Sequence, residues 1–308
     1  MKRFLEGKNF YRYAICCIVV GCLLIGIGYC MGGFSWTNVS ASSPTDSRTE
    51  TFSLNSNTNL VVNDSNTAVE IETVDSDELV VTMYETDNDY YTVERVGDTI
   101  TVTKHHENTF QLFGYWFEDG ATLVIEVPEQ YMNKITVDAS NGSITTTDVV
   151  AQELDFKTSN ASINLEGETQ VDDITLKSSN GSLNMDDVIC ENTIKATTSN
   201  ASINTYNVTS DSMTFTSSNG SINAEELTGK NIELTTSNAI VEFEDVTVTD
   251  SLNVKTSNGR IEGSLAGSET DYSISCDTSN GDCDVPTSSG NIKITLKTSN
   301  ASVTIETE

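Results

Sequence analysis

The chain has 308 residues with 46 acidic and 16 basic side chains, which give a formal net charge of −30 at pH 7. A chain of this length is long enough to bury a core and is typical of about two domains. The excess of carboxylates argues against nucleic acid and anionic lipid surfaces as partners of the folded body, because like charges repel.

The first 34 residues differ in composition from the rest of the chain. Four basic residues precede an uncharged run from Ala14 to Phe34. At ~1.5 Å per residue this run reaches ~31 Å, which is enough to cross a bilayer. Because basic residues flank only its N-terminal side, we expect a cytoplasmic segment at 1–13, a transmembrane signal-anchor at 14–34 and an extracellular body in the cell membrane.

Two other fates of this apolar run stay open. Val39-Ser40-Ala41 has the small residues that a signal peptidase recognises, so the body could be released after Ala41. Val19-Val20-Gly21-Cys22 resembles a lipobox, which would place a lipid on Cys22. The run is longer than the ~7–15 apolar residues of a signal peptide, and this length favours a retained anchor.

Residues 35–50 are rich in serine and threonine, contain Pro44 and are typical of a linker. The next segment, 51–134, has short strand-like runs without a strict repeat, and Ser65–Val69 resembles a degenerate copy of a turn that recurs later. We therefore expect residues 51–134 to form divergent N-terminal β coils of the same fold as the rest of the body.

One stretch of this segment, FQLFGYWFEDG, concentrates aromatic side chains. Such a cluster is expected either to plug an open flank of the fold or to contact a sugar, a peptide or a membrane interface. The residues are Phe110, Phe113, Tyr115, Trp116 and Phe117.

Metal-binding patterns in the same segment are weak. His105 and His106 are adjacent, so in a strand they point to opposite faces and do not share one metal, and we expect solvated loop residues. The acidic runs 75–78 and 87–89 lack the glycine and distal glutamate of an EF-hand loop. The sequence therefore predicts no metal and no cofactor.

A Ser-Asn turn followed by glycine or alanine recurs through residues 135–308 at spacings of 19 to 22 residues. A fixed period of this size indicates a solenoid, in which each repeat buries its apolar face against its neighbours. The turn asparagines are Asn141, Asn160, Asn180, Asn200, Asn219, Asn238, Asn258, Asn280 and Asn300.

Alignment on the asparagine shows which positions face inward. Apolar residues recur six and four positions before it and three positions after it, which is the period of two expected of a strand on each side of a corner. Apolar residues eight positions after it predict a shorter third side. The predicted fold is therefore all-β, a parallel β-helix whose coils of about 20 residues stack ~4.8 Å apart.

The asparagine itself tolerates left-handed backbone at the corner and can bond local backbone groups, and identical amides one coil apart can hydrogen-bond along the axis as a ladder. The residue after it is small, either glycine or alanine. This turn ladder is predicted to be scaffold and not a series of active sites.

Cys276 and Cys283 occupy the two core positions on either side of the Asn280 corner. In an oxidising compartment they can form a disulfide, and the alternative is two buried thiols in place of aliphatic side chains. Cys190 is the remaining cysteine of the body.

The repeated SNG/SNA turn, the segment Leu123–Pro128 and the N-terminal anchor resemble a bacterial family of unknown function described as "putative adhesins" with β-strand repeats. The resemblance covers about residues 50–308. It implies an envelope-facing β-solenoid, in some relatives alongside cell-envelope-stress signalling in Gram-positive bacteria. It supplies no catalytic residues.

These observations predict a non-catalytic, membrane-anchored adhesin or envelope scaffold whose partner is an envelope protein or a cell-wall glycan. Two alternatives are a polysaccharide-acting β-helix enzyme, which needs clustered carboxylates on one face, and a purely structural spacer. The last repeat stops close to the end of the sequence and is followed only by Glu306–Glu308. We therefore expect the C-terminal coil to be the open end of the stack and a site of docking or self-association.

Overall fold

The computed structural model describes residues 46–307, except residues 87, 107–121, 130–131 and 288. These residues form strands and turns, apart from one 3-10 turn at Glu269–Asp271, and they all belong to one compact unit. That turn is far too short to cross a bilayer, so the described part of the chain holds no membrane-spanning helix. The predicted anchor at 14–34 lies outside the described residues.

Each coil of the solenoid has a first side before its Ser-Asn turn, and parallel strands stack along this side. The separate strands of the first side are β2 (Asn59–Asp64), β6 (Thr99–His106), β8 (Met132–Ala139), β10 (Val150–Lys157), β12 (Thr169–Lys177), β18 (Tyr272–Asp277) and β20 (Ile292–Lys297).

The second side follows the turn and is also parallel. Its separate strands are β3 (Ala68–Val74), β7 (Thr122–Pro128), β9 (Ile144–Thr147), β11 (Ile163–Glu166), β17 (Ile261–Leu265), β19 (Cys283–Asp284) and β21 (Val303–Thr307). In the middle of the stack one strand runs from the second side, through a short third side, to the first side of the next coil. These long strands are β13 (Leu183–Thr197), β14 (Ile203–Thr216), β15 (Ile222–Thr235) and β16 (Val241–Lys255).

The corner between the second and third sides uses left-handed backbone, seven residues after the turn asparagine. Aspartate and asparagine tolerate this conformation better than most residues, and glycine adopts it freely. The residues are Asp148, Gly167, Asp187, Asn207, Glu226 and Asp245, with φ between 50° and 71°.

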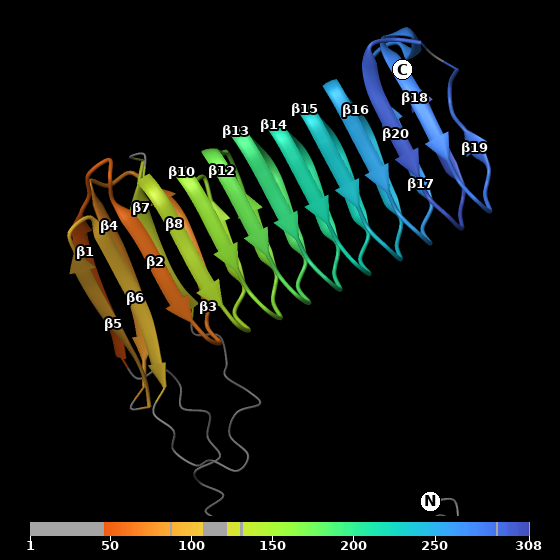
Figure 1. Ribbon diagram of the computed structural model, residues 1–308. Helices are drawn as coiled ribbons and strands as arrows, with labels where there is room; N and C mark the ends of the chain where they lie inside the picture. Colours follow the sequence, from red (N-terminus) through yellow and green to blue (C-terminus); the bar gives the residue numbers. More distant parts are fainter. Residues whose placement is uncertain (1–45, 87, 107–121, 130–131, 288, 308) are drawn as a thin grey trace, which may run out of the picture. The chain divides into compact units, whose positions relative to one another are not determined.

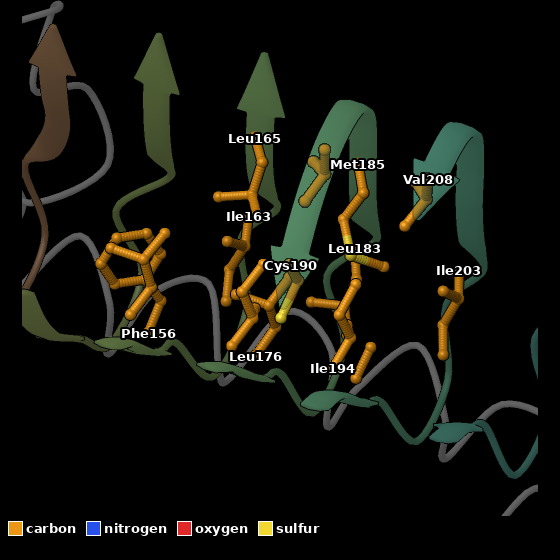
Figure 2. Close-up of a cluster of buried hydrophobic side chains, with 14 of the residues drawn as sticks. Phe156, Ile163, Leu165, Leu176, Leu183, Met185, Cys190, Ile194, Ile203 and Val208 are labelled. Atoms are coloured by element: carbon orange, nitrogen blue, oxygen red, sulfur yellow. The ribbon is translucent and has the colours of Figure 1, made fainter. Parts of the chain in front are cut away.

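The core is the inside of the coil, as the alternating pattern predicts. Ile194, Ala196 and Ile203 are fully buried, and their equivalents in the other repeats are at most 1% exposed, except in the repeat of Asn280. Val188 and Val208 on the third side are also fully buried. Figure 2 shows side chains from the sides of successive coils meeting in this interior.

The order of coils in space differs from their order in the chain at the N-terminal end. Strands β2 and β3 lie between β6 and β7 on one side and β8 and β9 on the other. Figure 1 shows the orange strand β2 between the later strands β6 and β8. The first coil of the chain is therefore the second in the stack.

The same exchange occurs at the C-terminal end, and it overturns the prediction that the last repeat is the open end. Strands β20 and β21 pair with β16 and β17 on one side and with β18 and β19 on the other. The outermost coil is thus 272–284, and the C-terminal strand is paired on both sides (Figure 1).

Residues 51–134 are only partly the divergent coils that we predicted. Strands β1 (Asp46–Ser53), β4 (Glu78–Glu85) and β5 (Asp89–Val96) are antiparallel to their neighbours. Strand β5 pairs with β6 on the first side, and β4 and β1 extend the second side beyond β7. These strands bury Leu79, Val81 and Met83 over the end of the core. They form a cap, in which only β5 and β6, among the described strands, are consecutive strands that pair across a tight turn.

Candidate functional site

The turn asparagines form a continuous amide ladder along the stack. Each Nδ2 donates to the Oδ1 of the asparagine one coil nearer the capped end, at a distance of 2.6 to 2.8 Å. The ladder follows the spatial order of the coils, so its last three members are Asn258, then Asn300, then Asn280. It starts at Asn66, so Ser65–Val69 is a true copy of the turn.

The left-handed backbone that asparagine tolerates is not used at these turns, because no turn asparagine is among the described residues with positive φ. Backbone bonds to the preceding coil hold the turn instead. The N–H groups of Ser199 and Asn200 both donate to the carbonyl of Ser179, at 3.2 and 3.0 Å.

In eight of the nine repeats a hydroxyl two residues before the asparagine ties neighbouring turns together, and the exception is Ala139 before Asn141. Thr198 Oγ1 donates to the carbonyl of Gly181 at 3.1 Å, and Ser217 Oγ donates to that of Ala201 at 3.1 Å. In the coils with glycine the hydroxyl also accepts a backbone bond, as from Gly220 N to Ser217 Oγ at 2.9 Å. The turns therefore satisfy one another, which is the behaviour of a scaffold.

The small residue after the asparagine alternates strictly along the stack. In spatial order the residues are Thr67, Gly142, Ala161, Gly181, Ala201, Gly220, Ala239, Gly259, Ala301 and Gly281. A Cβ at Gly220 would lie under 3.0 Å from the carbonyl oxygen of Ala201, and the other glycines face their own neighbours in the same way. Glycine is thus sterically required at these positions, and only the spatial order of the last two coils keeps the alternation.

An open groove bordered by polar side chains lies on the second side across β13–β16, with a volume of about 430 Å³. Two rows of outward side chains border it, and the registers of neighbouring strands align each row. One row is Asn184, Asn204, Asn223 and Glu242, and the other is Asp186, Tyr206, Glu225 and Glu244. The buried residues Met185, Thr205, Ala224 and Phe243 lie beneath them.

The asparagine row is a second amide ladder that our sequence analysis missed. The Nδ2 of Asn204 donates to the Oδ1 of Asn184, and the Nδ2 of Asn223 donates to the Oδ1 of Asn204, each at a distance of 2.8 Å. The recurrent S-I/L-N after the turn is the signal that could have revealed it. Since every amide donates toward the capped end, the ladder stops at Asn223 and next meets the carboxylate of Glu242, which is an acceptor.

The groove is strongly acidic. Glu226 is the largest cause that raises the pKa of the exposed Tyr206 phenol, and desolvation, Glu225, Asp187 and Asp186 add to it. The first side differs, because its lysines pair with carboxylates, as in Lys230–Asp211 at 2.6 Å and Lys157–Asp138 at 3.1 Å. No lysine or arginine lines the groove. The groove therefore offers hydrogen-bond acceptors and an aromatic ring to a ligand rich in donors.

The structure joins Cys276 and Cys283 in a disulfide, with their Cα atoms 6.3 Å apart. Cys276 is half-buried and Cys283 is exposed, since their coil is outermost and has no further coil to cover its core positions. Cys190 is a free, buried thiol, and burial raises its pKa to about 11.

The remaining predicted features are not brought together into a site. His105 and His106 lie at the end of strand β6, not in a loop, and contact Thr92 Oγ1 and Asp89 Oδ1, both at 2.8 Å. Within the described residues no three metal-ligating side chains cluster. The aromatic stretch Phe110, Phe113, Tyr115, Trp116 and Phe117 lies outside those residues.

The fold and turn pattern agree with comparisons with known proteins. The model of the Toastrack DUF4097 family matches residues 57–308. The chain belongs to this family. No curated protein sequence matches the chain.

Two solved structures share the fold. One is a "putative adhesin" from Parabacteroides merdae, 11% identical with a TM-score of 0.50, where the match covers 86% of this chain and 97% of that one. The other is a "putative lipid binding protein" from Parabacteroides distasonis, 17% identical with a TM-score of 0.51, covering 85% and 97%. At these identities the likeness shows the fold alone.

Proposed function

We propose that this Toastrack DUF4097 chain is a membrane-anchored, extracytoplasmic and non-catalytic β-solenoid that acts as an adhesin or envelope scaffold. The groove across β13–β16 carries the proposal. Its two aligned rows repeat one polar group per coil, which suits an extended ligand that is contacted at several coils. A fold neighbour described as a "putative adhesin" is consistent with this role.

The chemistry of the groove favours a cell-wall glycan or the donor-rich segment of an envelope protein. Sugar hydroxyls and ammonium groups donate hydrogen bonds, and the groove presents the carboxylates of Glu225, Glu242 and Glu244 as acceptors. Tyr206 is 44% exposed beside them and offers a ring face to a sugar or an aliphatic stem.

Anchoring at 14–34 rests on the length and charge flanks of that apolar run. An accessory role in envelope-stress signalling rests on the family resemblance and would use the same extracellular body.

Protease added to intact cells should remove the body and spare the N-terminal segment. Recovery of undigested chain from intact cells, with digestion only after permeabilisation, would contradict this topology.

The binding test uses the full chain displayed on cells and measures retention of purified cell-wall fragments. Tyr206→Ala and Glu225→Gln should each weaken retention about tenfold, the loss expected from one or two contacts. Glu233→Gln is the matched control, because it removes a carboxylate from the same strand β15 on the other side of the coil. Equal retention by Glu225→Gln and Glu233→Gln would exclude the groove as the binding site.

The acidic groove also keeps the polysaccharide-acting enzyme as a second candidate, since four carboxylates, those of Asp186, Glu225, Glu242 and Glu244, border one open surface. An enzyme would shorten the bound glycan with time, whereas a scaffold returns it intact. Turnover that disappears in Glu225→Gln, Glu242→Gln or Glu244→Gln but persists in Glu233→Gln would replace the scaffold by an enzyme.

A further inference from the structure

The two ends of the stack have edge strands of different character. At the capped end, β1 carries Arg48 and Glu50, and Arg48 pairs with Glu85 at 2.9 Å. The other edge strand there, β5, exposes Glu94 and Arg95. Charged side chains on an edge strand oppose pairing with another chain.

Strand β18, at the other end, has less of this protection. It pairs with β20 on one side and with no other described strand. Its outward side chains are Ser273, Ser275 and Asp277, and Lys297 one coil inward neutralises Asp277 at 2.9 Å. The strand one coil inward has Lys293 beside Ser273. Ile274 and Cys276 are half-buried, although their equivalents in β20 are fully buried. The outer face of the edge thus carries one charge, on the ion-paired Asp277, and its inner face is incompletely covered.

We propose that this edge pairs antiparallel with the same edge of a second copy of the chain. An antiparallel register centred on Ile274 places Tyr272 opposite Cys276 and Ser273 opposite Ser275 of the other copy. Residues directly opposite share one face of the sheet, so apolar side chains meet inside and serines meet outside. A single strand that matches itself in this way is what a two-fold interface requires.

Charge near the edge sets how the pairing responds to salt. In this register Asp277 lies opposite Asp271 of the other copy, and Lys297 already binds Asp277 at 2.9 Å. Residual repulsion between two acidic bodies is screened by salt. Association is therefore expected to strengthen as ionic strength rises. The disulfide ties the strand to the adjacent corner and holds the edge in place for pairing.

Pairing at this end leaves the β1 strands of the two copies at opposite ends of the joined stack, because β1 belongs to the cap. The chain that precedes β1 leads to the predicted anchor. If the anchor is retained, which is part of the proposed function, the two copies belong to two facing membranes. The adhesin would then be homotypic, with its own kind as the partner.

The test uses the full chain in detergent micelles, with sedimentation equilibrium as the measure of self-association. Ser273→Lys with Ser275→Lys places lysine opposite lysine twice, and we expect association to weaken at least about tenfold. Thr295→Lys is the matched control, because it creates the same Lys-x-Lys pattern with Lys293 one coil inward on a strand already paired on both sides. This control should associate as the parent chain does.

Charge complementation identifies the register. A copy with both serines changed to glutamate should also fail to self-associate, but mixed with the lysine variant it should form a heterodimer. Monomeric parent chain, unchanged association of the lysine variant or failure of the mixture would each overturn the proposal.

A second measurement separates this inference from the anchoring. Vesicles that carry the full chain should cluster, and the lysine variant should abolish the clustering. Dimers in detergent without vesicle clustering would keep the edge pairing and reject the membrane-bridging role.

Discussion

The middle of the stack and its two ends follow different rules. From β10 to β16 each coil lies beside the coil that precedes and follows it in the chain. At both ends the coil nearest the terminus lies one step inside, and an internal segment forms the outer layer.

This difference has a physical reason. A terminal strand at an open edge has partners on one side and a free end, so it frays. Here β2 and β21 are each paired on both sides, and the outer coil 272–284 is joined to the stack through both of its chain ends. Strand β1, which precedes β2 in the chain, pairs with β4 alone. The exchange teaches that a solenoid can place its first and last coils inside the stack by reordering coils.

The largest expected effect comes from breaking the glycine–alanine alternation in the middle. Gly220→Ala forces a Cβ against the carbonyl of Ala201, and neighbours on both sides prevent a shift, so we expect a loss of about 3 kcal/mol in the free energy of unfolding. Gly281→Ala makes the same clash with Ala301 in the outermost coil, where one side is free, and should cost less. Denaturant unfolding of the two variants checks the ranking.

Ala201→Gly is the control for this pair, since it removes a Cβ without a clash and should cost about 0.5–1 kcal/mol. Equal losses for Gly220→Ala and Gly281→Ala would show that the outermost coil is as constrained as the middle.

The next effect concerns the outermost coil. Replacing Cys276 and Cys283 by alanine removes a cross-link over 7 residues and should lower the local stability of that coil by about 2 kcal/mol. Hydrogen exchange should accelerate in 272–284 and stay unchanged in β14 and β15. Acceleration throughout the stack would mean that the ends and the middle unfold as one unit.

Two buried threonines of the middle coils give smaller and opposite effects. Thr205 Oγ1 is buried without a hydrogen-bond partner, so Thr205→Val should stabilise the fold by about 1 kcal/mol. Thr198 is equally inaccessible but donates to Gly181, so Thr198→Val should destabilise by about 1 kcal/mol. Thermal unfolding measures both, and a shared sign would contradict the role given to the turn hydroxyls.

The smallest effect is the response of the cap to acid. Burial alone would raise the pKa of Glu85, but the bond from Arg48, the N–H of Tyr91 and the charge of Arg48 together lower it. A lowered pKa contributes stability above the unfolded pKa of about 4.3, and this stability is lost as pH falls through the folded pKa. Hydrogen exchange in β1 and β4 should therefore accelerate below about pH 4 more in the parent chain than in Glu85→Gln.

An identical acid response of the parent chain and Glu85→Gln would remove Glu85 as the cause. The middle coils serve as the internal reference, because they lie far along the stack from this ion pair.

The local rules of the coil could be read from the sequence. Alternation around each asparagine identified Ile194, Ala196 and Ile203 as core, because inward positions of a strand have a period of two and the period survives in every repeat. The groove was harder to find, since Asn184 and Asn204 are ordinary polar residues until the register aligns them one coil apart.

The sequence by itself determined the repeat, its length and the inward side chains, since these depend on residues close together in the chain. Tertiary structure alone decided which coils are neighbours at the ends, because near-identical coils pair almost equally well with one another and local sequence cannot choose between them. The choice depends on contacts between neighbouring coils. A Cβ on the residue after Asn280 or Asn258 would clash with the backbone carbonyl of the turn that lies beside it. In chain order the alternation is broken at Gly259, Gly281 and Ala301. In the stack the coil of Ala301 lies between the coils of Gly259 and Gly281, so the alternation is kept in space.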